Sequence, residues 1–140
     1  MKKLTTTLLF TAFSLLAFAQ STFTEKTLTD MRQRLLSTPW EKFSKEEVSP
    51  DFVMKGGEGK PCDMVCMEAL NNSSTLVAWP MEQIKIQQVG DVVTITGITH
   101  HSGIDKKTNK KWTANQRFNE TYAYKNGKWL WLTAKYTDIK

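Results

Sequence analysis

Cysteine and histidine are scarce in this chain of 140 residues, which contains two of each. Cys62 and Cys66 are spaced C-x-x-x-C, and the adjacent His100 and His101 lie far from them in the sequence. This pattern matches neither a zinc finger nor the C-x-x-C spacing of a redox motif. The sequence also lacks a P-loop, a dinucleotide-binding fingerprint and a Ser-His-Asp set. We therefore expect no metal site and no cofactor.

No apolar run approaches the roughly 20 residues that a membrane-spanning helix needs. The longest, residues 8–18, follows Lys2-Lys3 and ends at Ala17-Phe18-Ala19, a small-x-small cleavage site. These three parts are typical of a secretory signal peptide. We expect residues 1–19 to be removed, leaving a domain of residues 20–140 in the periplasm or outside the cell. No cysteine follows the cleavage site at once, so we expect neither a lipid anchor nor membrane association after cleavage.

The sequence also lacks a clustered basic surface. The formal net charge is +5 with 19 basic and 14 acidic residues, and it falls to +3 when the two lysines of residues 1–19 are removed (17 minus 14). The lysines are scattered, and the densest group surrounds Thr108-Asn109 in a predicted hairpin loop. Nucleic-acid binding needs basic residues gathered on one face, so we do not expect it.

The first half of the chain has helical patterns. In residues 22–37, apolar side chains recur near one helical face, whereas Arg32 and Arg34 are expected to point elsewhere. Pro39 interrupts this helix, and a second short helix is expected over 40–48. A short strand at 52–54 and a helix beginning at Pro61 follow.

The second half has the alternation and turn chemistry of strands. Gly90-Asp91 and Asn126-Gly127 are tight-turn signals between neighbouring runs. The expected strands are 75–79, 84–89, 92–100, 111–124 and 128–137. Helices followed by antiparallel strands indicate one α+β domain, with the helices on one face of a sheet.

Alternation along the last strand assigns its side chains to two faces. The apolar set is expected inside, so Trp129 and Trp131 are predicted on the outer face, where paired aromatic side chains typically mark a contact surface. In the alternative, a helix or the N-terminal segment covers them. The inner set is Leu130, Leu132, Ala134 and Tyr136.

Three motifs of the last 50 residues resemble the nuclear transport factor 2-like superfamily, in its small domain-of-unknown-function and polyketide-cyclase-like branch. They are residues 90–97 (GDVVTITG), 117–122 (RFNETY) and 126–129 (NGKW). The resemblance implies a cone, in which a curved antiparallel sheet wraps N-terminal helices and leaves a pocket at its open end. It also implies a homodimer, frequently through the convex face, which would bury Trp129 and Trp131 at the interface.

Three polar side chains are candidates for acid-base chemistry in such a pocket. Alternation places Glu120 and Tyr136 inside, and the family register also directs His101 inward. Burial raises the pKa of a carboxyl group toward neutrality, which makes it a usable acid or base. In the alternative, Glu120 lies at a strand edge in water and His101 only opens a hairpin loop. The expected lining residues are Trp40, His101, Phe118, Glu120, Tyr122, Leu132 and Tyr136.

Cys62 and Cys66 leave two possibilities open. In a helix, side chains four residues apart have Cβ atoms about 5–6 Å apart, whereas a disulfide needs about 3.8 Å. A bridge would therefore require a distorted first turn, and the alternative is two free thiols. The oxidising compartment that export implies favours the bridge.

These features suggest two functions for an exported domain. The leading hypothesis is a cone-fold domain that binds a small, largely apolar ligand or acts as a dimeric interaction module. The alternative is a cofactor-independent isomerase, dehydratase or hydrolase that uses a Glu and His pair in the pocket.

Overall fold

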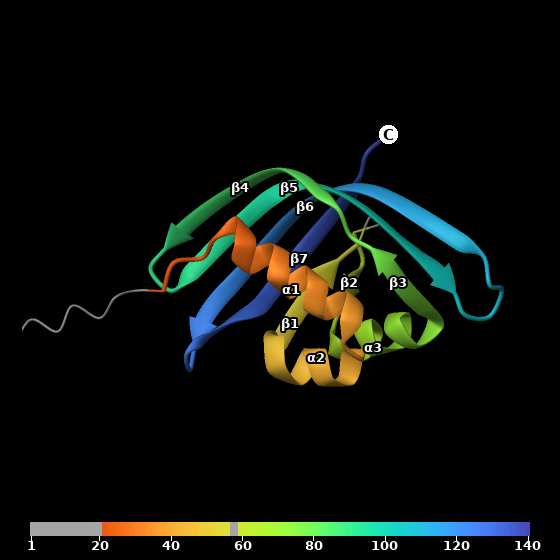
Figure 1. Ribbon diagram of the computed structural model, residues 1–140, viewed down its shortest axis with the longest axis horizontal. Helices are drawn as coiled ribbons and strands as arrows, with labels where there is room; N and C mark the ends of the chain where they lie inside the picture. Colours follow the sequence, from red (N-terminus) through yellow and green to blue (C-terminus); the bar gives the residue numbers. More distant parts are fainter. Residues whose placement is uncertain (1–20, 57–58) are drawn as a thin grey trace, which may run out of the picture.

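The computed structural model describes residues 21–56 and 59–140, so the predicted signal peptide lies outside the described residues. Within them, three helices lie on one side of a long curved sheet (Figure 1). No helix in this part of the chain has the length and apolar character to cross a membrane. The elements are α1 (Glu25–Ser37), α2 (Trp40–Glu47), β1 (Val48–Lys55), β2 (Pro61–Cys62), α3 (Met64–Ser73), β3 (Ser74–Ala78), β4 (Met81–Val89), β5 (Val92–Asp105), β6 (Lys111–Lys125) and β7 (Lys128–Asp138).

Local sequence sets the ends of α1. The side chain of Thr24 accepts a hydrogen bond from the Thr27 backbone, and the Thr27 side chain accepts one from the Thr24 backbone. This reciprocal capping satisfies two donors that the helix itself leaves unpaired. At the other end, Thr38 is extended because it precedes Pro39, and α2 begins at Trp40.

The strands form one open antiparallel sheet with a single parallel pair. Their order is β2-β1-β7-β6-β5-β3, and β4 also pairs with β5. Among the described strands, only β1 and β7 run parallel. The β6–β7 hairpin turns at Asn126 and Gly127, with φ of 52° and 81°, which is the left-handed conformation that such two-residue turns require. The predicted α+β cone, with a curved sheet over N-terminal helices, is thus confirmed.

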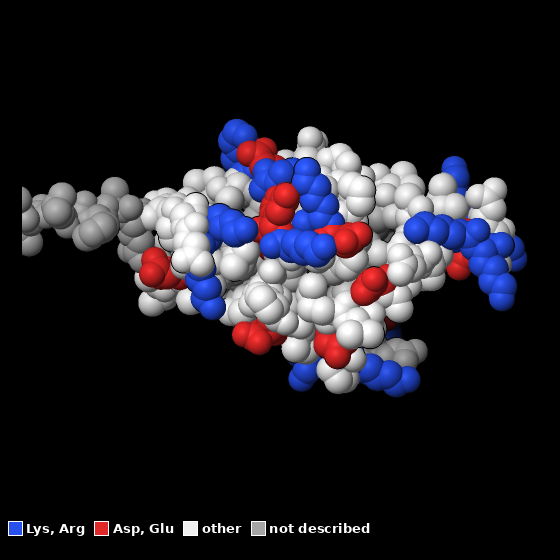
Figure 2. All heavy atoms as spheres, turned by 90° about the horizontal axis from the view of Figure 1, so that it is seen from below, with Lys and Arg blue, Asp and Glu red and all other residues white. Residues whose placement is uncertain are grey.

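The helix side of the molecule carries charges of both signs. Basic and acidic side chains lie next to one another there (Figure 2), including the pairs Lys26–Asp30 and Lys45–Glu41 within single helices. Such exposed pairs typically contribute little to stability, so this face is a mixed, solvated surface.

The predicted outward placement of Trp129 and Trp131 is wrong. Tyr122 lies opposite Trp131, but Thr121 lies opposite Thr133, so β7 contains one extra residue there. Such a β-bulge shifts the alternation of the strand by one position. Both the tryptophans before the bulge and the apolar residues after it, Ala134 and Tyr136, therefore lie inside.

The N-terminal segment covers Trp129, and Arg32 of α1 together with Phe52 of β1 covers Trp131. A helix and the N-terminal segment thus cover the two rings, as in the alternative that the sequence left open, but on the inner face of the sheet. Trp131 is only 1% exposed and Trp129 only 8%. The ring of Phe23, just before α1, lies 5.1 Å from that of Tyr122 and 5.2 Å from that of Trp129. Neither tryptophan is therefore available on the convex face for a partner.

Candidate ligand-binding pocket

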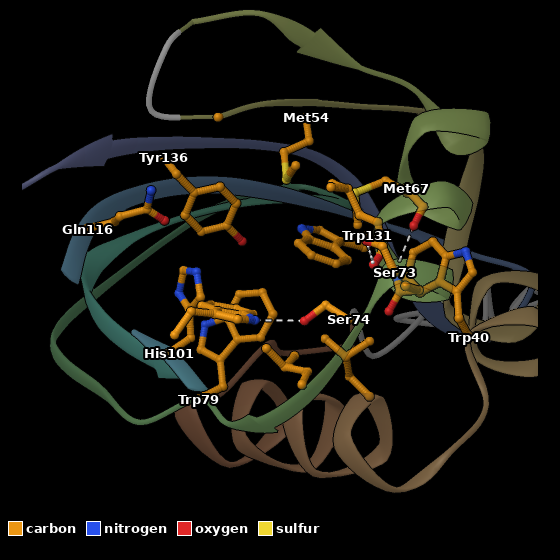
Figure 3. A pocket seen from close by; sticks show the side chains of 16 residues that line it. Trp40, Met54, Met67, Ser73, Ser74, Trp79, His101, Gln116, Trp131 and Tyr136 are labelled. Atoms are coloured by element: carbon orange, nitrogen blue, oxygen red, sulfur yellow. Dashed lines mark hydrogen bonds between the residues drawn. The ribbon is translucent and has the colours of Figure 1, made fainter. Parts of the chain in front are cut away.

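A pocket of about 390 Å³ lies between the inner face of the sheet and α3. Its volume is within the range of small-molecule sites. Aromatic rings form much of its wall, and Figure 3 shows them arranged around a common space. The lining residues are Leu35, Trp40, Met54, Gly56, Met67, Leu70, Asn71, Ser73, Ser74, Leu76, Trp79, His101, Trp112, Gln116, Trp131 and Tyr136.

The position of Trp112 depends on a glycine in the neighbouring strand. Gly103 on β5 lies opposite Trp112 on β6. A Cβ atom at Gly103 would overlap the Trp112 ring and lie 2.7 Å from the Thr75 carbonyl oxygen. The indole N–H of Trp112 donates to the Ser74 hydroxyl at 2.7 Å. The lack of a side chain at Gly103 therefore lets this ring lie flat against the sheet as a pocket wall.

His101 lies among three other rings of the pocket. Its ring centre is 5.0 Å from that of Trp79, 5.6 Å from that of Trp112 and 6.1 Å from that of Tyr136. Burial, followed by the positive charge of Arg32, lowers the pKa of His101 below its ordinary 6.5. The imidazole is therefore neutral near pH 7. Its Nδ1 atom is buried and has no hydrogen-bond partner among the described residues.

Behind the pocket wall, Glu120 accepts three hydrogen bonds. The Arg32 guanidinium and the Tyr122 hydroxyl donate to one carboxylate oxygen, the latter at 2.7 Å, and the Tyr136 hydroxyl donates to the other at 2.5 Å. The side chains of Arg32 and Glu120 are 4% and 0% exposed. Glu120 is not among the residues that line the pocket, so its carboxylate is enclosed by its own donors.

The ionisation of this cluster is fixed by burial and by its internal charges. Burial, together with the Glu120 carboxylate, holds the pKa values of Tyr122 and Tyr136 well above their usual 10.0. For Arg32, burial lowers the pKa, but the attraction of Glu120 more than offsets this and raises it above the ordinary value. The two tyrosines are thus neutral donors and Arg32 is a cation at all physiological pH values.

Arg32 also contacts two of the tryptophans that line the pocket. Its guanidinium carbon lies 4.6 Å from the ring centre of Trp79 and 4.9 Å from that of Trp131. Cations attract the faces of aromatic rings at such distances. Arg32 therefore packs against two tryptophans that line the pocket and also forms an ion pair with Glu120.

The structure places some of the predicted lining residues in the pocket wall and others outside it. Trp40, His101 and Tyr136 line it. Phe118, Glu120 and Tyr122 are buried in the core but lie outside the lining. Leu132, the extra residue of β7, also lies outside the lining, because the bulge interrupts the alternation that placed it inside.

Most residues of this region were not predicted from the sequence, and Arg32, Trp112 and Trp79 show why. Arg32 was expected to point away from the core, yet it lies four positions after Leu28 and three before Leu35, both buried, so helical spacing alone could have placed it inside. Trp112 lies eight residues before Glu120 on the same strand, so alternation places both side chains on the same face of the sheet. Trp79 follows the end of β3 and had no comparable signal.

A disulfide joins Cys62 to Cys66, with Cα atoms 5.1 Å apart. The Cβ distance of two helical residues four positions apart does not apply here. Cys62 belongs to β2, and α3 begins only at Met64, after the Asp63 cap. The bridge ties β2 to the first turn of α3. In the sheet Cys62 lies opposite Met54, a pocket residue, so the bridge joins two walls of the pocket. The described residues contain no cluster of three or more His, Cys, Asp or Glu that could hold a metal.

No protein-family model and no curated protein matches this sequence. Solved structures match its fold over most of the chain. A nuclear transport factor 2-like protein from Cytophaga hutchinsonii is 14% identical with a TM-score of 0.69, covering 84% of this chain and 100% of that one. A nuclear transport factor 2-like protein of unknown function in nutrient uptake from Rhodospirillum rubrum is 13% identical with a TM-score of 0.67, covering 81% and 98%. The calmodulin-dependent kinase II hub homology domain from Chlamydomonas reinhardtii is 12% identical with a TM-score of 0.62, covering 82% and 94%.

Proposed function

We propose that this chain, which has the nuclear transport factor 2-like fold, binds a small and largely apolar ligand in its aromatic pocket. The observation that supports this is a cavity of about 390 Å³ whose walls are mostly tryptophan, methionine and leucine side chains. Apolar concave sites with a few polar groups are the usual form of ligand pockets. The wall behind the cavity rests on the buried ion pair of Arg32 and Glu120.

The geometry favours binding over acid-base catalysis by Glu120. A general base must reach the proton that it removes, directly or through one water. Both oxygens of Glu120 already accept hydrogen bonds from Arg32, Tyr122 and Tyr136. His101 lines the pocket but forms no hydrogen bond with Glu120 in the described residues. We therefore assign Glu120 a structural role.

The proposed function is tested with an apolar fluorescent probe, N-phenyl-1-naphthylamine, titrated into the protein. Leu76→Trp fills the pocket, because Leu76 lines it. Val77→Trp is the matched control, since Val77 is the next residue of β3 and is 55% exposed. We expect Leu76→Trp to weaken probe binding at least tenfold and Val77→Trp to leave it unchanged. Equal affinity in both variants, or no binding to the wild type, would contradict the proposal.

We also propose that the domain self-associates through the convex face of the sheet. The two tryptophans do not contribute, but Val92 and the half-buried Leu130 flank the buried Ala123 in an apolar row across β5, β6 and β7. Val92 is 44% exposed, and the helices all lie on the opposite side of the sheet (Figure 1). A second copy of the chain would cover this row. Sedimentation should show a dimer that Val92→Lys dissociates, and a monomeric wild type at about 100 µM, far above the micromolar range of specific interfaces, would refute it.

Export remains a proposal based on the sequence of residues 1–19. The intact mass of the protein isolated from its native host should correspond to residues 20–140. Recovery of the full-length chain from the host cytoplasm would refute both export and cleavage.

A further inference from the structure

We infer that the ligand of this pocket is an uncharged, planar ring compound whose polar group faces His101 and Gln116. This inference rests on the proposed function of the pocket and narrows the class of ligand. It follows from the charges around the cavity, from the shape of its walls and from the positions of its polar side chains.

The described lining of the pocket offers no charged side chain to a ligand. None of its described lining residues is Lys, Arg, Asp or Glu. The nearest buried cation, Arg32, is paired with Glu120 and lies against the rings of Trp79 and Trp131. An ion that leaves water without gaining a partner loses far more free energy than a neutral group does. A charged ligand would therefore be disfavoured in this cavity.

The walls match a flat molecule. The rings of His101 and Trp79 are inclined by only 33° to each other, whereas Trp112 and Tyr136 stand nearly edge-on to His101, at 82° and 72°. Aromatic rings favour offset stacking and edge-to-face contact, and this arrangement offers both to an aromatic guest. An aromatic guest can make the same kinds of contact with the tryptophan and tyrosine rings that line the cavity, which favours a planar ring.

The polar side chains of the pocket form two groups. Asn71, Ser73 and Ser74 lie on α3 and at the start of β3, where each donates a hydrogen bond to a backbone carbonyl oxygen of the protein. In Figure 3, His101, Gln116 and Tyr136 lie on the side opposite Trp40 and Met67. The Gln116 amide nitrogen donates to Asp138 at 2.7 Å, which leaves its carbonyl oxygen as an acceptor. A neutral imidazole can either donate or accept. The Tyr136 hydroxyl is already used by Glu120, so His101 and Gln116 are the groups that a ligand hydroxyl, carbonyl or amide would meet.

A matched probe pair tests the charge of the ligand. N-Phenyl-1-naphthylamine and 1-anilinonaphthalene-8-sulfonate share their rings and differ by a sulfonate. Each probe is titrated into the wild type and into the Leu76→Trp variant. The binding that is lost in the variant is the part that occurs in the pocket. We expect the neutral probe to bind in the pocket at least tenfold more tightly than the anion. Equal or tighter binding of the anion would overturn the inference alone, whereas failure of both probes would overturn the proposed function and the inference with it.

A second pair tests the polar contact. Binding of 2-naphthol and of naphthalene is measured in the wild type, in His101→Phe and in His100→Phe. His101→Phe keeps a ring in the wall, and His100 is an exposed neighbour that hydrogen-bonds Asn115 on the outside. One lost hydrogen bond is typically about 0.5–1.5 kcal/mol. We therefore expect the preference for 2-naphthol over naphthalene to fall about two- to tenfold in His101→Phe only. An unchanged preference in that variant, confirmed as folded by circular dichroism, would overturn the assignment of His101.

Discussion

Arg32 on α1 and Glu120 on β6 form a buried ion pair across 88 positions of sequence. Their side chains are 4% and 0% exposed. A buried pair loses the hydration of both charges, and its attraction compensates for this only when additional hydrogen bonds are present. Here Tyr122 and Tyr136 supply those bonds. The pair therefore fixes α1 against the sheet in one orientation.

Removal of one partner from this pair should be strongly destabilising. Glu120→Gln leaves the Arg32 charge buried without a counter-ion, and we expect the free energy of unfolding in urea to fall by about 3–5 kcal/mol. The control is Glu41→Gln at the Lys45–Glu41 pair, whose side chains are 72% and 83% exposed. Such an exposed pair typically contributes little to stability. Similar losses in the two variants would contradict the structural role of Glu120.

The two histidines should have opposite effects on the pH dependence of stability. Burial lowers the pKa of His101 below 6.5, so the unfolded chain binds the proton more readily and stability is lost as pH falls through this range. Hydrogen bonds to Asn115 and then to Glu82 raise the pKa of His100, so its contribution is present at acidic pH and is lost as pH rises through the raised pKa.

Between pH 7 and pH 5 we therefore expect His101→Gln to lose less stability than the wild type, and His100→Gln to lose more. Urea unfolding of the three proteins at several pH values gives the slope of the free energy of unfolding against pH. The carboxylates contribute equally to all three slopes, so differences between the slopes report on the histidines. Identical slopes would argue against the buried, neutral state of His101.

A methyl group at Gly103 should displace the Trp112 wall of the pocket. The added carbon would overlap the Trp112 ring and approach the Thr75 carbonyl oxygen at 2.7 Å. Overpacking of this kind typically costs about 1–3 kcal/mol. Gly103→Ala should therefore unfold at lower urea and bind N-phenyl-1-naphthylamine more weakly. Gly56→Ala is the control, because nothing lies within 4 Å of a Cβ atom there, and an equal loss of stability in both variants would refute the explanation.

Reduction of the Cys62–Cys66 bridge should loosen one side of the pocket. For so short a loop, the chain-entropy model gives about 2 kcal/mol of stabilisation. The bridge joins β2, opposite Met54, to the first turn of α3, which continues into Met67. We expect dithiothreitol to lower both the urea midpoint and probe affinity in the wild type. A Cys62→Ser, Cys66→Ser double variant should not respond to the reductant, and a response there would assign the effect to another cause.

Much of the architecture was predictable because its signals are local. The capped helix before Pro39 and the turns at Gly90 and Asn126–Gly127 depend on residues adjacent in sequence. Their conformations follow from steric limits and from hydrogen bonds over three or four positions. The order of helices and then antiparallel strands followed from these signals, and the resemblance in the last strands indicated the same cone.

The faces of β7 were decided only by the tertiary structure. Strand alternation has a period of two, and it holds only while the pairing is regular. Near Trp131, β7 shifts register against β6 and also against β1, whose paired residues jump from Val48 to Val53. A bulge of this kind depends on how the strand fits both neighbours, and the parallel neighbour β1 comes from the other end of the chain. The sequence of β7 alone therefore determined that it is a strand, whereas the packing of β1, β6 and Phe23 decided that its tryptophans lie inside.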